Sequence, residues 1–204
     1  MEGYWGYWHG GKGYSGVSLH VSKTLAPERP TFAHPAFDFE TRIATVDVET
    51  PLGTLTVASA YVPNGGKDFT AKMRFLEAMD AYAASYQASG RLLALLGDIN
   101  VARTERDVHP KERKALAIGQ LPEERALVDR IVGRGLVDVG RALDPENSDL
   151  FTWWPPWRNM RQRNIGWRLD HVFASEALAS RATSCEVQAS VGTSDHAPVI
   201  ANFI

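Results

Sequence analysis

The sequence predicts an α/β (α+β) fold in which strands outnumber helices and the helices pack outside the sheets. Three observations lead to this expectation. Residues 42–61 alternate apolar and polar side chains around a Pro-Leu-Gly turn, which is typical of a half-buried hairpin. Residues 69–89 change to a helical period, and residues 92–96 form a short apolar run that suits a buried strand. Sheets with helices outside follow from that mixture.

The composition predicts one soluble domain, which we place at residues 1–204. Of the 204 residues, 44% are hydrophobic and 23% are charged, enough for a sizeable core. The net charge of −2 gives no general sign of nucleic-acid binding, so a basic surface must be local. A single cysteine, Cys185, excludes an internal disulfide framework and favours a cytoplasmic location. Because no apolar run approaches the roughly 18 residues of a membrane helix, we expect no membrane contact.

The N-terminal third is predicted to consist mainly of strands. Residues 2–9 are an aromatic, strand-like segment, residues 10–13 suit a turn, and residues 14–21 suit a second strand. Three prolines make residues 24–37 a loop. The hairpin at residues 42–61 then ends in a loop that begins near Pro63.

The first long helix is predicted from one apolar face within residues 69–89. Its large side chains recur at i, i+4, i+7 and i+11, at Phe75, Met79, Tyr82 and Tyr86. We expect this face to be core. A second helix, residues 122–132, begins at a proline followed by two glutamates. The remaining segments are a charged loop at 102–114, a polar linker at 141–150, an aromatic loop at 153–168, and strands at 169–174, 186–191 and 199–203.

Two polar residues follow the central apolar strand, which Gly97 is expected to end. Asp98 and Asn100 are two residues apart, so on an extended chain their side chains point to the same side. A carboxylate beside a carboxamide suits a site that handles a metal-bound water and a phosphate. An Asx turn that merely closes the strand is an equally weighted alternative.

Other polar groups stand at strand ends elsewhere in the chain. They are Tyr61 with Asn64, the single Asp170, and Asp195 with His196. Each alone reads as an ordinary surface residue, but one rim of a sheet could gather them all. The neighbouring side chains of Asp195 and His196 diverge, so we expect them to serve different partners.

Convergence of these groups would require a cation. Two carboxylates about 4 Å apart repel by roughly 4 kcal/mol near a protein surface. Asp98, Asp170 and Asp195 could therefore share a pocket only with a metal ion or a protonated histidine. Oxygen ligands without a thiolate cluster favour Mg²⁺ or Mn²⁺ over zinc.

Three motifs occur in order along the chain: Gly97-Asp98-Ile99-Asn100-Val101, Trp167-Arg168-Leu169-Asp170 and Ser194-Asp195-His196-Ala197-Pro198. Residues 12–17, 60–64, 121–125 and 135–138 accompany them. Together they resemble the exonuclease III/apurinic endonuclease family of the endonuclease/exonuclease/phosphatase fold, over essentially the whole chain. The resemblance implies a two-sheet β-sandwich flanked by helices.

The resemblance also implies roles for the polar residues. Asp98 would orient or deprotonate the attacking water, and Asn100 would contact the scissile phosphate. His196 would stabilise the developing charge while Asp170 holds its ring. Asp195 would be a metal-site carboxylate, with Asp98 and Asn100 as further metal ligands. Phosphate contacts are implied for Tyr61 and Asn64.

Four of the six tryptophans fall between positions 153 and 167, which a core alone does not require. By resemblance, Trp153, Trp167 and Leu169 would form an apolar pocket for a flipped abasic sugar, and Trp157 would lie near a wedge into the duplex. Asn164 joins the substrate-binding set. Arginines of the loop would supply positive charge for phosphates, at Arg158, Arg161, Arg163 and Arg168. The alternative is that Trp153 and Trp167 are core anchors.

The sequence departs from the family at its start. The family opens with a strand, a helix and a strand that ends in a glutamate, the principal Mg²⁺ ligand, and this strand–helix–strand unit is lacking here. Glu2 is the nearest acid. We therefore expect a truncated domain whose uncovered sheet edge is protected by a homodimer or other self-association.

Three functions follow from these observations. The first is a Mg²⁺-dependent 3′→5′ exodeoxyribonuclease, with or without abasic-site cleavage in DNA repair, acting on duplex DNA, 3′ ends and abasic sites. The second is a DNA-binding protein whose catalysis is weakened or lost with the glutamate. The third is a phosphatase of the same fold that acts on a lipid or inositol phosphate.

Overall fold

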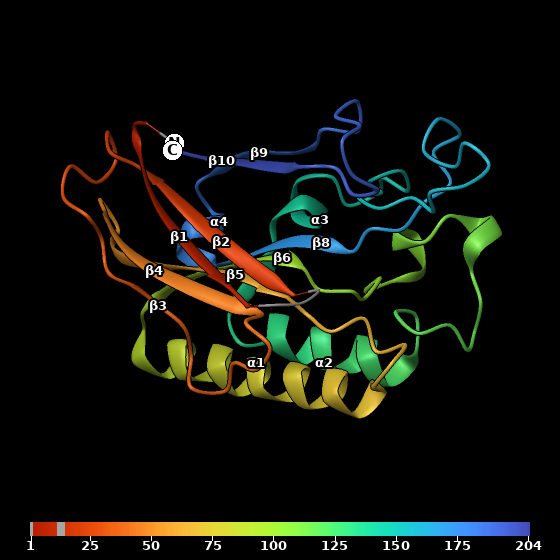
Figure 1. The fold of residues 1–204 in the computed structure, drawn as a ribbon, viewed down its shortest axis with the longest axis horizontal. Helices are drawn as coiled ribbons and strands as arrows, with labels where there is room; N and C mark the ends of the chain where they lie inside the picture. The colour runs from red at the N-terminus through yellow and green to blue at the C-terminus, as the bar shows by residue number, and fades with distance from the viewer. Residues whose placement is uncertain (1, 12–14) are drawn as a thin grey trace.

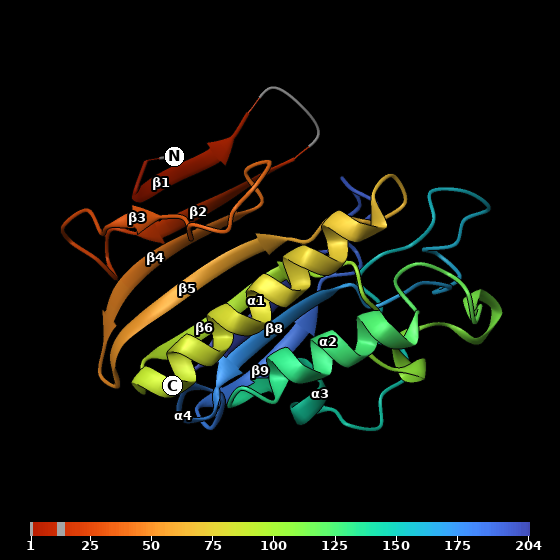
Figure 2. The same ribbon diagram turned by 90° about the horizontal axis from the view of Figure 1, so that it is seen from below.

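The computed structural model describes residues 2–11 and 15–204 and arranges them in three layers (Figures 1 and 2). A six-stranded sheet forms the middle layer. Helices α1 (Phe69–Ser89) and α2 (Pro122–Val132) cover one face. Two hairpins cover the other face, so the α/β class with outer helices is confirmed.

The central sheet is mixed. Its strand order is β3 (Phe32–Ala33), β4 (Ile43–Thr50), β5 (Gly53–Tyr61), β6 (Leu92–Asp98), β8 (Asp170–Ser175) and β7 (Leu136–Asp138). The predicted hairpin is confirmed, because β4 and β5 pair antiparallel through a tight turn. β5 and β6 run parallel, and α1 is the crossover that such a pair requires.

Helix α1 forms where the helical period predicts it. The Asp68 carboxylate caps its first turn by accepting the Ala71 N–H at 2.9 Å, and Gly90 closes it in the left-handed conformation. Phe75 and Met79 are completely buried and pack against β6 and α2 residues. The predicted face is therefore core.

The outer layer consists of two hairpins, each a two-stranded sheet. β1 (Tyr4–Gly10) pairs with β2 (Gly16–Ser22), and β9 (Ala182–Val187) pairs with β10 (Val199–Phe203). Both place apolar side chains on the central sheet. A largely apolar groove of about 460 Å³ lies beside β10, between it and strands β6 and β8.

Several boundaries differ from the predictions. β6 continues through Gly97 to Asp98, because it pairs there with both neighbours. β9 ends at Val187, because the chain turns after the pair that Val187 forms with Val199. Several short elements were missed, because a strand of two or three residues or a helix of one or two turns is too short to show a period. They are β3, β7, η1 (Glu105–Asp107), η2 (Pro110–Glu112), α3 (Val139–Leu143) and α4 (Glu176–Ala179).

The predictions for residues 10–14 and for membrane-spanning helices have the following outcomes. Half of the turn predicted at residues 10–13, and the start of the strand predicted from Tyr14, lie outside the described residues. Over the described parts of the chain, no helix is both long enough and apolar enough to cross a bilayer.

Gly97 gives a test of the parallel β5–β6 pair. At φ +124° it lies against Ala60, whose carbonyl oxygen would overlap any added Cβ. Gly53 has a similar φ of +106° but open space around it. We expect Gly53→Ala to lower the free energy of unfolding by about 1–2 kcal/mol through backbone strain. Gly97→Ala should lower it by at least about 2 kcal/mol more because of the overlap. Urea unfolding measures both, and equal losses would contradict the close packing.

Candidate active site

Sheet register brings three polar side chains together. Tyr61 at the end of β5 is level with Asp98 at the end of β6, and Asp98 is level with Asp170 at the start of β8. Three adjacent strands therefore present a phenol and two carboxyl groups at one end of the sheet. The rim that the sequence predicted is formed here by hydrogen-bonded register.

Asp98 and Asn100 form a compact turn. Asp98 Oδ1 accepts the Asn100 backbone N–H at 2.9 Å, and Asp98 Oδ2 accepts the Asn100 carboxamide N–H at 2.8 Å. Asn100 has a φ of +55°, so the chain is not extended there. An Asx turn therefore forms at Asp98, and it holds the two side chains together rather than separating them. Asn64 joins them by donating to Asn100 Oδ1 at 3.2 Å.

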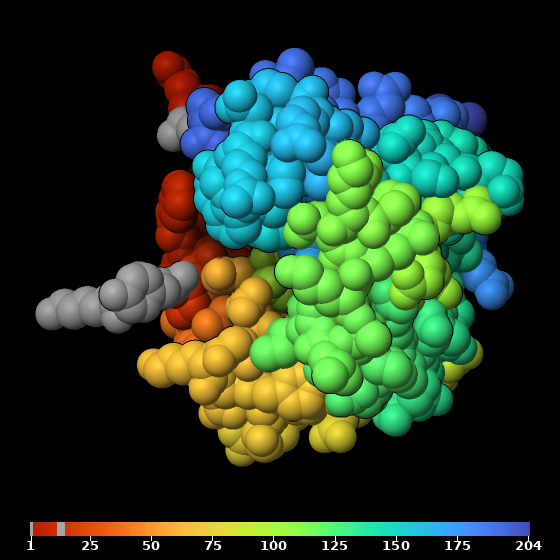
Figure 3. All heavy atoms as spheres, turned by 90° about the vertical axis from the view of Figure 1, so that its right-hand side faces the viewer, coloured from red at the N-terminus to blue at the C-terminus, as the bar shows by residue number. Residues whose placement is uncertain are grey.

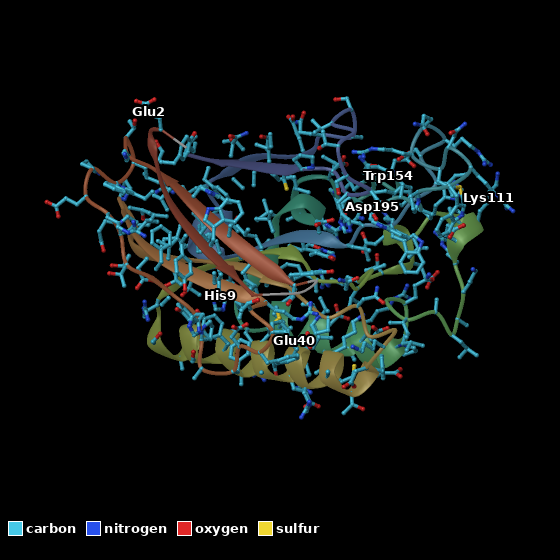
Figure 4. The ribbon with its side chains drawn as sticks, in the orientation of Figure 1. Glu2, His9, Glu40, Lys111, Trp154 and Asp195 are labelled. Carbon is cyan, nitrogen blue, oxygen red and sulfur yellow. The ribbon has the colours of Figure 1, made fainter. Side chains whose placement is uncertain are left out.

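Asp195 and His196 serve different partners, as predicted. His196 Nδ1 lies 2.8 Å from Asp170 Oδ2, whereas Asp195 Oδ2 accepts the indole N–H of Trp153 at 2.9 Å. The backbone N–H of Trp154 donates to the Asp195 carbonyl, and Figure 4 shows these two residues side by side. The late loop and the tryptophan loop are therefore joined at the site.

The electrostatics of the cluster follow from burial and crowding. Burial and the neighbouring Asp170 raise the pKa of Asp98 to about 7. Burial alone would lower the pKa of His196, but its hydrogen bond to Asp170 and the charges of Asp98 and Asp195 raise it. Burial would raise the pKa of Asp195, yet the bond from Trp153 holds it below its ordinary value. The arrangement favours an imidazolium beside crowded carboxyls.

These side chains line a pocket of about 420 Å³. Its walls contain nine predicted residues and Ile118, which sequence reasoning missed: Tyr61, Asn64, Asp98, Asn100, Ile118, Trp153, Trp167, Leu169, Asp195 and His196. Figure 3 views this end of the molecule, where yellow-orange, green and cyan segments surround a hollow. Asp170 is not part of this wall but contacts it through His196.

Two predicted substrate-binding residues lie outside the pocket wall. Trp157 is 57% exposed and lines a neighbouring hollow of about 450 Å³. The Asn164 carboxamide oxygen accepts the Trp154 indole N–H at 3.1 Å, which ties it to a buried tryptophan. Trp153 and Trp167 pack edge to face, with ring centroids 5.7 Å apart, beside the buried Leu169.

Two of the predicted phosphate-binding arginines are otherwise engaged, which corrects that expectation. Arg168 is buried and donates to the carboxylates of Asp107 and Asp138 at 2.6–2.9 Å. Arg161 donates to three backbone carbonyls of residues 189–194 and stacks on Trp154. Both guanidinium groups hold the loops of the site in place rather than facing a ligand.

A buried ion pair that sequence reasoning missed lies beneath the pocket. Lys72 Nζ is 2.5 Å from Glu124 Oε1, and both side chains are inaccessible to solvent. Lys72 also donates to the backbone carbonyls of Asn100 at 2.7 Å and Asn64 at 3.2 Å. Glu124 accepts the backbone N–H groups of Gly119 and Leu121. One signal was present in the sequence, since position 72 lies on the buried face of α1 with Phe75 and Met79.

The carboxyl groups of the cluster fit a hard divalent cation, while the His196 ring is held by Asp170. One ligand atom from each of Asp98, Asp170 and His196 lies within 4.8 Å of the others. Burial and the nearby Asp170 carboxyl raise the pKa of Asp98, and a bound cation would relieve the repulsion between the two carboxyls. Asp195 and Asn100 offer further oxygen atoms in the same pocket. Glu2 lies at the far side of the molecule from Asp195 and does not reach the cluster (Figure 4).

Comparison with known proteins gives consistent similarities. The Endonuclease/Exonuclease/phosphatase family matches residues 2–196. Exodeoxyribonuclease III of Haemophilus influenzae is 32% identical, covering 98% of this chain and 81% of that protein. A 3′ phosphatase, NExo, from Neisseria, bound to a product DNA hairpin, superposes with a TM-score of 0.86 at 29% identity, covering 99% of this chain and 80% of that one. AP endonuclease LMAP from Leishmania major gives a TM-score of 0.86 at 25% identity, covering 97% and 69%.

The Lys72–Glu124 pair gives a second stability test. Lys72→Met leaves the Glu124 charge buried without its partner, so we expect the free energy of unfolding to fall by about 3–5 kcal/mol. Lys72→Met combined with Glu124→Gln removes both charges and keeps an acceptor for Gly119 and Leu121. This double variant should regain at least about 2 kcal/mol of that loss in urea unfolding. A double variant no more stable than Lys72→Met alone would mean that the charge is not the cause.

The raised pKa of Asp98 gives a pH test in metal-free protein. The folded chain keeps this proton up to about pH 7, whereas an unfolded aspartate loses it near pH 4. The folded state therefore binds more protons in that interval, and this contribution to stability declines as pH rises from 4 to 7. We expect the Tm of Asp98→Asn to rise relative to wild type by several degrees across this interval. Parallel Tm curves would contradict the shift.

Proposed function

The chain belongs to the endonuclease/exonuclease/phosphatase family, and on this premise we propose that it is a metal-dependent DNA nuclease of DNA repair. Its main activity is that of a 3′→5′ exodeoxyribonuclease, and cleavage at abasic sites is a second activity of the same pocket. The observation that carries the proposal is the Asp98–Asp170–His196 cluster at the base of a pocket with aromatic walls. The similarity to an exodeoxyribonuclease III and to an AP endonuclease supports it.

Water attack on a phosphodiester needs a base and a stabiliser of negative charge. Asp98, with a pKa of about 7, is suited to orient or deprotonate the water near neutral pH. His196 is held by Asp170 through Nδ1, so its other ring nitrogen is available to the phosphate oxygens. As an imidazolium it would stabilise the charge that develops on the phosphorus centre.

The amide and phenol groups of the pocket would position the phosphate. Tyr61 and Asn64 lie on the wall beside Asp98, and Asn100 is held by the turn and by Asn64. Because Lys72 fixes the backbone on both sides of this wall, little reorganisation is needed when the substrate enters.

A divalent ion, Mg²⁺ or Mn²⁺, would be held by Asp98, Asn100 and Asp195, with Asp170 close by. When bound it supplies positive charge to the phosphate oxygens. The pocket presents oxygen ligands, which suits these hard ions.

The aromatic part of the pocket suits a base-free nucleotide. Trp153, Trp167 and Leu169 form an apolar surface next to the reacting groups. A flipped abasic sugar would fit this surface, at a cost in stacking that is lowest at a damaged site. Trp157 is exposed on the adjoining loop, where it could contact the duplex as a wedge.

Digestion of an end-labelled DNA duplex tests the proposal. We expect Mg²⁺-dependent shortening from the 3′ end, and we expect Asp98→Ala to reduce the rate by at least about 1000-fold because the water loses its base and a metal ligand. Asp144→Ala is the matched control, since Asp144 is an exposed aspartate outside the pocket. Its rate should equal that of the wild type.

The alternatives predict different results. Absence of cleavage by the wild-type chain, with duplex binding retained, would show a DNA-binding protein without catalysis. Release of phosphate from an inositol phosphate, with the duplex left uncut, would show the phosphatase. A duplex with one internal abasic site reports the second activity separately.

Self-association stays a proposal, and the comparisons give it no support. Its physical basis is the apolar groove beside β10, next to which Ile200 is 46% exposed. We expect the sedimentation coefficient of the chain to rise with concentration in the micromolar range. Ile200→Lys places a charge on this face and should abolish the rise. A sedimentation coefficient independent of concentration would exclude the dimer.

A further inference from the structure

A second group of side chains that could hold a metal ion lies outside the pocket wall. His9 is near the end of β1, and His34 and Asp38 lie in the segment between β3 and β4. One ligand atom from each lies within 4.8 Å of the other two. Figure 4 places His9 away from Asp195, so this group is separate from the cluster at Asp98.

The contacts of Asp38 prepare it as a ligand. Its Oδ1 accepts the backbone N–H groups of Arg42 at 2.8 Å and Ile43 at 3.1 Å. Its Oδ2 faces His9 Nε2 at 2.6 Å. The Asp38 side chain is only 6% exposed. The two bonds to Oδ1 fix the orientation of the carboxylate and leave Oδ2 to face a ligand, as is common for metal-binding carboxylates.

The two histidines differ in exposure. The His9 side chain is 14% exposed and held by Asp38, whereas His34 is exposed. Their rings stack with centroids 4.4 Å apart. Rotation of the exposed His34 ring about its side-chain bonds would direct a nitrogen toward the space between His9 Nε2 and Asp38 Oδ2.

We propose that His9, His34 and Asp38 bind one divalent transition-metal ion of the zinc class. Two imidazoles and one carboxylate are a ligand set that Zn²⁺ accepts, with water at the fourth position. The nitrogen ligands favour zinc, cobalt or nickel over Mg²⁺, which prefers oxygen. The site therefore differs in metal preference from the oxygen-rich pocket at Asp98.

The proposed ion would join the β1–β2 hairpin to the central sheet. β1 supplies His9, and Asp38 precedes β4. Asp38 also holds Arg42, whose guanidinium lies over the Tyr61 ring at 5.0 Å. A metal here would thus fix the hairpin to the strand that leads to one wall of the pocket.

The alternative is that His9 and Asp38 form a simple hydrogen bond with no metal. Under the alternative, His34 only stacks on the His9 ring, whereas under the metal proposal it supplies a ligand. His34→Gln is therefore the decisive variant, and its exposure makes misfolding a minor concern. His20→Gln is the matched control, because His20 is on the same hairpin but outside the group.

Zinc binding to the full chain is measured by calorimetry with millimolar Mg²⁺ present to saturate the oxygen-rich pocket. We expect one equivalent of Zn²⁺ to bind to the wild type and to Asp98→Ala. His34→Gln should bind at least tenfold more weakly, and His20→Gln like the wild type. Cobalt in place of zinc should give the visible absorption of a four- or five-coordinate ion, lost in His9→Gln.

Three results would overturn the proposal. They are no zinc binding in the presence of Mg²⁺, equal binding by His34→Gln and wild type, and loss of the zinc site in Asp98→Ala. None of these measurements depends on cleavage of DNA. Failure of the zinc site and failure of the nuclease proposal are therefore distinguishable.

Discussion

The close approach of β6 to β5 is the constraint on which the site depends. Gly97 lies against the backbone of Ala60, and only a residue without a side chain fits at its φ of +124°. This contact fixes the register that sets Tyr61 level with Asp98, and β8 then sets Asp170 level with Asp98. Residues far apart in the sequence meet because three strands end in step, so the chemistry of the pocket is built by the sheet and not by a flexible loop.

Charged side chains, most of them buried, hold the loops around the pocket in place. Lys72 and Glu124 together bind four backbone groups on loops that line the pocket. Arg168 binds Asp107 and Asp138 beneath the start of β8, and Arg161 binds the loop that precedes Asp195. Such groups add little net stability compared with apolar residues, but each fixes a geometry that apolar contacts would leave loose. The buried ion pairs, which contribute little net stability, thus lie around the pocket.

Some of this arrangement follows from sequence and some does not. The helix at residues 69–89 and the hairpin at 42–61 show their periods clearly, and both form as predicted. Asp98 and His196 stand in short motifs next to strands, so a local pattern found them. The partner of Lys72 is 52 positions away at Glu124, and no local pattern reveals such a pair. Arg168 looked like a surface cation for the same reason, since its two carboxylate partners come from other elements.

The topology of the outer layer has a consequence for how the molecule responds to heat. The loop that returns from β9 to β10 carries Asp195 and His196, and this hairpin is a two-stranded sheet set on the central one. An isolated two-stranded hairpin is at best marginally stable, so this one depends on the apolar side chains that it packs on the central sheet. Parts of a protein open at their own free energies, and an opening of this hairpin would separate His196 from Asp170. Heat that loosens the packing of the hairpin would therefore reach the pocket through His196.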